Sequence, residues 1–188
     1  MLRVIWAFWL ISGTWLQTVS AEALSPGVEI RGSQAFFDES FLDLQEELDL
    51  AKEEGKIGIL IMFEIDDCPF CYRMKHTVLN RSDVQDYFHS YFRILSINAE
   101  ARLEMTDFSG EMLTLKEFSL KRNRVRATPV FQFYDLQGKL FKNGRFIGAT
   151  TDADEFLLLG KYFVEQHNKD ISFFRFRRSL KETAADGL

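Results

Sequence analysis

The sequence predicts an α/β fold with a mixed central sheet flanked by helices, and three observations support this. Residues 57–63 form a short, continuous apolar run, which is typical of a strand buried on both faces. Segments with helical periodicity lie before and after this run. Further along, two strand-like segments are joined by a turn at 135–138 and followed by another helical segment. This order favours a mixed sheet.

The first half of the chain predicts helix, strand, helix, helix and strand. One face of the first predicted helix carries apolar residues at spacings of four and three, namely Phe37, Phe41, Leu44, Leu48 and Ala51. Gly55 is well placed to end that helix. After the strand at 57–63, a helix begins at Cys68, and Ser82 is a suitable N-cap for a second helical piece. Residues 92–97 are predicted to form the next strand.

The second half predicts an insertion and then a strand hairpin with a final helix. Residues 98–113 are mixed in character and contain a Ser-Gly turn, so we interpret them as an insertion after the second strand. A short basic helix is predicted at 115–123. Strands at 130–134 and 140–147 precede a last helix at about 152–167.

Composition and length limit the classes of protein that fit. The chain has 188 residues, 46% of them hydrophobic, with 19 Phe, which excludes disorder of the whole chain. Its net charge of −5 provides no basic surface of the kind that nucleic acids need, so we expect no nucleic-acid partner. We divide the mature chain into a flexible lead at 24–34, one domain at 35–168 and a C-terminal extension at 169–188. The basic and aromatic residues of that extension suit a membrane surface or a partner, but we favour packing on the domain.

The N-terminal segment has the features of a secretory signal. Arg3 precedes an apolar run from Val4 to Leu16, and the small residues Ala21 and Ala23 offer cleavage sites. That run is 13 residues long, whereas a membrane-spanning helix needs about 20. We therefore expect a signal peptide at 1–23 and a periplasmic or otherwise exported protein, with an uncleaved anchor as the alternative.

The two cysteines of the chain, Cys68 and Cys71, are separated by only two residues. A disulfide across so short a loop constrains the unfolded chain little, by about 2 kcal/mol, so a structural role is a poor explanation. At the start of a helix, unpaired N–H groups and the macrodipole favour a thiolate. Cys68 is therefore the expected nucleophile and Cys71 the residue that resolves the mixed disulfide. Pro69 suits the first helical turn because it needs no N–H partner.

These motifs resemble thioredoxins over residues 35–168. The resemblance is carried by the buried strand, by the run from Cys68 to Cys71, by Thr128-Pro129 before another strand, and by Gly148 before the last helix. The Cys-Pro-aromatic-Cys motif, the preceding helix and the insertion make the chain most similar to periplasmic thioredoxins of the SoxW type. The resemblance implies that Pro129 is cis and faces the cysteines. It also implies a substrate-binding surface formed by Thr128, Pro129, Pro69, Phe70 and Gly148.

One position departs from the family pattern. Cytoplasmic thioredoxins carry a buried Asp six residues before the first Cys, where it accepts a proton near the resolving thiol, and this chain has Met62 there. Glu64 is the nearest acid on the strand. Glu64 is therefore a candidate proton acceptor, and a solvated carboxylate at the strand end is the equally weighted alternative.

The sequence predicts a protein-disulfide reductase or isomerase that acts on other exported proteins. Asp66 and Asp67 beside Cys68 disfavour its thiolate, which favours the reducing direction. We expect a membrane thiol reductant as electron donor, a monomer, no bound metal, and no cofactor beyond the redox-active disulfide between Cys68 and Cys71. The main alternative is a metal or haem-apoprotein chaperone that uses the same cysteines. A non-catalytic adaptor with the same fold is a third hypothesis.

Overall fold

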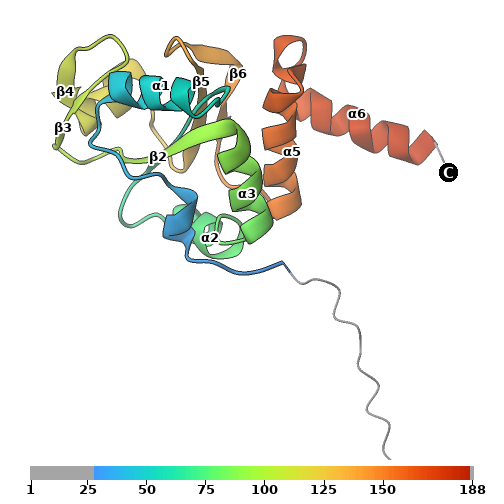
Figure 1. The fold of residues 1–188 in the computed structure, drawn as a ribbon. Helices are drawn as coiled ribbons and strands as arrows, with labels where there is room; N and C mark the ends of the chain where they lie inside the picture. The colour runs from blue at the N-terminus through green and yellow to red at the C-terminus, as the bar shows by residue number, and fades with distance from the viewer. Residues whose placement is uncertain (1–27, 187–188) are drawn as a thin grey trace, which may run out of the picture.

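A four-stranded mixed sheet forms the centre of the molecule. The computed structural model describes residues 28–186, so the predicted signal at 1–23 lies outside the described residues. The strand order is β2-β1-β5-β6, with β1 parallel to β2 and both remaining pairs antiparallel (Figure 1). The strands are β1 at Gly58–Glu64, β2 at Phe92–Asn98, β5 at Val130–Asp135 and β6 at Leu140–Ile147. The predicted mixed α/β fold is confirmed.

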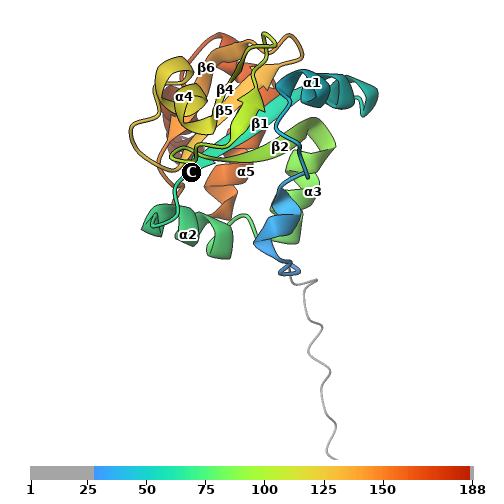
Figure 2. The same ribbon diagram turned by 90° about the vertical axis from the view of Figure 1, so that its left-hand side faces the viewer.

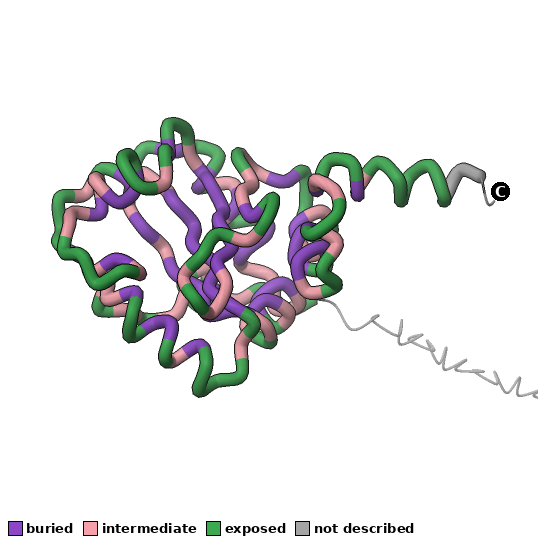
Figure 3. The backbone as a smooth tube through the Cα atoms, turned by 90° about the horizontal axis from the view of Figure 1, so that it is seen from above, coloured by how far each residue is buried: buried purple, intermediate pink, exposed green. Residues whose placement is uncertain are grey.

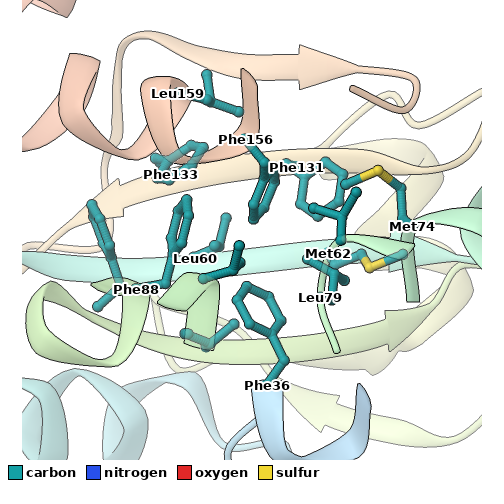
Figure 4. Close-up of a cluster of buried hydrophobic side chains, with 14 of the residues drawn as sticks. Phe36, Leu60, Met62, Met74, Leu79, Phe88, Phe131, Phe133, Phe156 and Leu159 are labelled. Carbon is teal, nitrogen blue, oxygen red and sulfur yellow. The ribbon is translucent and has the colours of Figure 1, made fainter. Parts of the chain in front are cut away.

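One face of the sheet is covered by three helices that stand close together in Figure 2. They are α2 at Pro69–Thr77, α3 at Ser82–Tyr91 and α5 at Ala153–Val164. Leu60 and Met62 of β1 face this side and meet Phe156 and Leu159 of α5 in a fully buried cluster (Figure 4). Each such side chain contributes roughly 1.5–3 kcal/mol of burial free energy, so this cluster holds α2 and α5 on the sheet.

The opposite face carries the other residues of β1, because successive side chains of a strand alternate between faces. Ile59, Ile61 and Phe63 pack there in a second buried cluster. Its helical cover consists of α1 at Leu44–Glu53, α4 at Leu115–Glu117 and the π-helical turn Phe118–Arg122. A strand buried on both faces explains the unbroken apolar run in the sequence.

The first α-helix begins later than the periodicity predicts. Phe41 is almost fully exposed, and the helix starts at Leu44, where the Asp43 carboxylate accepts N–H bonds from the first turn. Leu42 adopts a positive φ of 64°, which a continuous helix does not allow. The prediction of a helix from Phe37 is therefore wrong at its start. Instead, a 3-10 helix at Ser33–Phe36 inserts its last residue into the core.

The insertion after β2 forms a hairpin of β3 at Glu104–Thr106 and β4 at Met112–Thr114. At its turn, the Asp107 carboxylate accepts bonds from the Ser109 and Glu111 N–H groups at 2.8 and 3.1 Å. Residues 98–113 therefore contain the predicted turn, and the hairpin leads directly into α4.

Both ends of the described chain are attached to the domain. Ile30 pairs with Arg81 between α2 and α3, and the Arg31 N–H donates to the Asn80 carbonyl at 2.7 Å. At the other end, a 3-10 helix at His167–Lys169 leads into α6 at Phe173–Asp186. The start of α6 packs on the domain, and the rest projects away from it (Figures 1 and 3). Within residues 28–186, no helix combines the length and apolar character needed to cross a bilayer.

Candidate active site

Cys68 and Cys71 lie at the N-terminus of α2 and are joined by a disulfide bond. Cys68 is the N-cap residue, and its Sγ accepts a hydrogen bond from the Cys71 N–H at 3.1 Å. An N-cap position directs helical N–H groups at the sulfur, which stabilises a thiolate there once the disulfide is reduced. Cys68 is 7% exposed and Cys71 only 2%. Cys68 is therefore the more accessible cysteine of the pair.

The loop before β5 lies directly opposite Cys68. The Thr128–Pro129 peptide bond is cis, and the Thr128 hydroxyl donates to Cys68 Sγ at 3.3 Å. Gly148 joins this group because its N–H donates to the Pro129 carbonyl at 2.8 Å. Its φ of +94° belongs to the region that favours glycine. The structure thus brings Thr128, Pro129 and Gly148 together at the disulfide, while their role in client binding stays a prediction.

The exposed side of α2 presents aromatic side chains beside the disulfide. Pro69 is exposed at the first position of the helix, and Phe70 is 61% exposed between the two cysteines. Tyr72 is also exposed, and its ring stacks on that of His76 with 3.8 Å between centroids. The periodicity of α2 could have indicated this stack, because positions i and i+4 lie on one helix face. Apolar surface is therefore exposed on α2 beside the disulfide.

Glu64 is held in a half-buried polar group with Lys75 and Ser96. Its carboxylate pairs with the Lys75 ammonium at 2.6 Å and accepts a bond from the Ser96 hydroxyl at 2.6 Å. Lys75 is one turn beyond Cys71 on α2, so the acid is tied to the helix that carries the disulfide. These contacts argue against a freely solvated strand-end carboxylate. Whether Glu64 takes the proton of Cys71 stays a prediction.

Met62 occupies a wholly apolar position. It is fully buried in the cluster that contains Met74, Leu79 and Phe131, as Figure 4 shows. An ionised carboxylate would be costly there without a partner, because the surrounding side chains provide no hydrogen bonds. The acid of β1 closest to this position along the strand is Glu64, two residues further on at the end of β1.

The two loops that flank the disulfide differ in charge. Asp66 and Asp67 precede Cys68, and Asp66 accepts a bond from the Asn98 amide at 2.8 Å. On the other side, exposed Arg124 and Arg126 precede Thr128. A cavity of about 290 Å³ opens between these loops and extends to Leu120 of the π-helical turn.

Among residues 28–186, no group of three or more His, Cys, Asp or Glu side chains is placed to hold a metal ion.

The arrangement is suited to exchange between a dithiol and a disulfide. It provides one accessible sulfur at a helix N-terminus, a second sulfur within bonding distance, and a loop that presents backbone groups beside them. Such exchange needs a thiolate that attacks and a neighbouring thiol that resolves, and both are present in one turn of helix.

Comparisons with known proteins agree with this geometry. Among solved structures, a thioredoxin-fold protein from Helicobacter pylori has a TM-score of 0.63 at 15% identity, covering 84% of this chain and 96% of that one. A proposed disulphide-isomerase from Bacteroides thetaiotaomicron has a TM-score of 0.54 at 27% identity, covering 73% and 97%. The DsbH oxidoreductase has a TM-score of 0.52 at 18% identity, covering 80% and 92%. No curated protein matches the chain.

A family model provides the assignment that the structural likeness alone does not. The model of the thioredoxin-like domain matches residues 44–163, from the start of α1 to the end of α5, which is more than half of the chain. The match includes both cysteines, the cis-proline loop and the insertion. The chain belongs to the thioredoxin-like domain family.

Proposed function

We propose that this protein is an exported thiol–disulfide oxidoreductase that reduces or isomerises disulfides in other exported proteins. The observation that carries the proposal is the position of Cys68. It caps α2, its sulfur accepts the Cys71 N–H, and it faces Thr128 of the cis-proline loop. The 27% identity to the proposed disulphide-isomerase supports the same chemistry.

The reaction transfers two electrons from the dithiol to the client. The Cys68 thiolate attacks one sulfur of the client disulfide, that bond breaks, and the other client sulfur leaves as a thiolate. Cys71 then loses its proton and attacks the Cys68 sulfur, which releases the second client thiolate and leaves the Cys68–Cys71 disulfide. Glu64, held by Lys75, is the proposed acceptor of the Cys71 proton. Both client thiolates take protons from solvent.

The reducing direction is favoured by charge next to the nucleophile. The carboxylates of Asp66 and Asp67 disfavour a further anion at Cys68, so the disulfide is the more stable form and the dithiol the better reductant. A membrane thiol reductant then has to restore the dithiol, and the protein acts as a monomer without a further cofactor. The likeness to SoxW-type thioredoxins suggests proteins of sulfur oxidation as clients.

The reduction potential tests the proposal directly. We expect equilibration in glutathione buffers to give a value nearer to the roughly −270 mV of thioredoxin than to the roughly −120 mV of a strong oxidant. The double variant Asp66→Asn/Asp67→Asn should raise the potential by about 30 mV, a tenfold change in the equilibrium constant. A potential near −120 mV in the wild type would contradict the reducing direction.

Trapping of clients distinguishes the proposed oxidoreductase from a metal chaperone. A Cys71→Ser variant should accumulate mixed disulfides with exported proteins, and Cys68→Ser should accumulate none. If Cys71→Ser traps nothing, while the wild type retains stoichiometric copper or zinc after dialysis and Cys68→Ser loses it, the protein is a metal chaperone instead.

A further inference from the structure

A groove between β6 and α6 begins beside the active site. Ile147 and Ala149 line its near end, and Gly148 between them donates its N–H to the Pro129 carbonyl. From there the groove extends to Phe173 and Phe174 of α6 and has a volume of about 510 Å³. It therefore continues the surface on which a client disulfide has to lie.

The far wall of this groove comes from outside the matched family domain. α6 begins at Phe173, beyond the match at residues 44–163. The ring of Phe173 contacts those of Phe146 and Tyr162 at centroid distances of 5.8 and 5.5 Å, and these contacts fix the helix on the domain. The next residue, Phe174, is 65% exposed, and Ile147 across the groove is 60% exposed. Two large apolar side chains at a groove mouth are typical of an interaction site.

The edge of the sheet along this groove is available for pairing. Among the described strands, β6 is hydrogen-bonded to β5 alone. The bond from the Gly148 N–H to the Pro129 carbonyl shows that the backbone groups of Gly148 point toward β5. Because these directions alternate along an antiparallel strand, the backbone groups of Arg145 and Ile147 point away from β5. An extended peptide can add to such an edge as a further strand.

The charges beside the groove indicate which peptide it can bind. Arg177 lines the groove and is paired with Glu155, whereas the guanidinium of Arg145 is taken up by the Asn123 carbonyl. The Arg177 guanidinium also lies 4.9 Å from the centre of the Phe174 ring. Three more basic side chains follow on the exposed part of α6, namely Arg175, Arg178 and Lys181. Asp152 and Asp154 lie on the α5 side, next to Arg177 and Lys181. The basic side chains of α6 beside the exposed Phe174 complement an apolar segment with acidic neighbours.

We propose that this groove binds an extended segment of the client protein in which apolar and acidic side chains alternate. The segment pairs with the β6 edge at Arg145 and Ile147 and places its apolar side chains between β6 and Phe174. This proposal rests on the proposed function, since the bound protein is the one whose disulfide reaches Cys68. It assigns to the C-terminal extension the selection of clients.

Competing peptides test the groove. Each peptide has about twelve residues and one Cys joined to glutathione, flanked by alternating Val and Asp in one peptide and Val and Lys in the other. We expect the reduced protein to react with the Val–Asp peptide roughly 10-fold faster, equivalent to about 1.4 kcal/mol. Phe174→Asp should bring the ratio of the two rates to within about twofold. Leu103→Asp is the matched control, because it adds the same charge to an apolar position of similar exposure that is neither on α6 nor in the groove, and it should keep the ratio.

Equal rates with the two peptides, or an equal loss of the ratio in both Asp variants, would overturn the proposal. A protein that reacts with neither peptide nor with oxidised glutathione would contradict the proposed function instead. In that case, fluorescence anisotropy of a Val–Asp peptide with Ser in place of Cys still tests the groove, and equal binding to the wild type and Phe174→Asp would refute it. Phe174-dependent binding to phosphatidylglycerol vesicles, without selection between the peptides, would assign α6 to a lipid surface and also overturn the proposal.

Discussion

The two edges of the central sheet differ in how the chain covers them. At β2, the Asp38 N–H donates to the Ile94 carbonyl at 2.8 Å, and the Asp38 carboxylate accepts from the Ile94 N–H at 2.6 Å. At β6, by contrast, the backbone groups of Arg145 and Ile147 point away from the sheet beside an open groove. One edge is closed by the segment that precedes α1, and the other is left accessible.

This difference indicates where the molecule can accept a partner strand. An uncovered edge is a hazard for aggregation unless it is short or has a use. The open part of β6 ends at Gly148, next to the cis-proline loop, whereas the closed edge at β2 is on the far side of β1 from that loop. A client bound at Cys68 as proposed would thus meet the accessible edge.

The largest expected loss of stability comes from breaking the ion pairs of Arg93 on β2. Arg93 has a side chain that is 10% exposed and pairs with the 3%-exposed Glu47 and with Glu54. Arg93→Met leaves Glu47 buried without its partner, so we expect a loss of about 3–5 kcal/mol in the free energy of unfolding, measured with urea. Adding Glu47→Leu should recover most of that loss, because it removes the unpaired buried charge.

Replacing an arginine by methionine at the open edge should lower the free energy of unfolding by less. Arg145 donates to the Asn123 carbonyl, and its Nε donates at 2.8 Å to the oxygen of the buried Gln132 amide in the orientation that satisfies that amide's neighbours. Arg145→Met leaves both acceptors without these bonds and should lower the free energy of unfolding by about 1–3 kcal/mol. Equal losses for Arg93→Met and Arg145→Met would show that the two edges do not differ in this way.

Amide exchange should show the contrast residue by residue. The Ile94 amide is held by Asp38 and should exchange slowly, while the Ile147 amide should exchange quickly. Asp38→Ala removes the acceptor at β2 and should cost about 1–2 kcal/mol, with faster exchange at Ile94 and no change at Ile147. Slow exchange of Ile147 in the wild-type protein would mean that the β6 edge is already paired.

The sequence was sufficient for the parts of the fold that depend on local pattern. The unbroken apolar run of β1 identified a strand buried on both faces, and the spacing of Cys68 and Cys71 after it singled out the two residues that form the disulfide. Periodicity failed before Leu44, because Phe37 and Phe41 match a helical spacing while the positive φ of Leu42 prevents a helix there.

Contacts between distant residues could not be predicted in the same way. The polar group of Glu64, Lys75 and Ser96 depends on the register between β1 and β2 and on the rotation of α2, and the sequence contains neither quantity directly. The groove at β6 likewise needs the position of α6 relative to the sheet. The apolar and basic residues of the extension were visible in the sequence, but the surface opposite them was not.

The smallest expected effect concerns the hairpin and α4 beside the closed edge. Thr114 and Glu117 form a capping box, and Lys121 donates to the Glu117 carboxylate at 2.7 Å. The Lys121 hydrogen bond, followed by those from Thr114, lowers the pKa of Glu117 from 4.5 to about 2. Because the folded pKa lies below the unfolded one, this contribution to stability is complete above pH 4.5 and is lost as the pH falls through 2.

Carbon-detected titration of the Glu117 carboxyl should therefore give a midpoint near 2, and Lys121→Met should move it toward 4.5. Over the same acidic range, amide exchange in β3 and β4, corrected for its intrinsic pH dependence, should rise because the cap is lost. Exchange at Arg145 and Ile147 should not respond, since the open edge has no part in this cap. A Glu117 midpoint near 4.5 in the wild type, or an equal acid response of the amides of Arg145 and Ile147, would contradict the assignment of this cap to the hairpin and α4 alone.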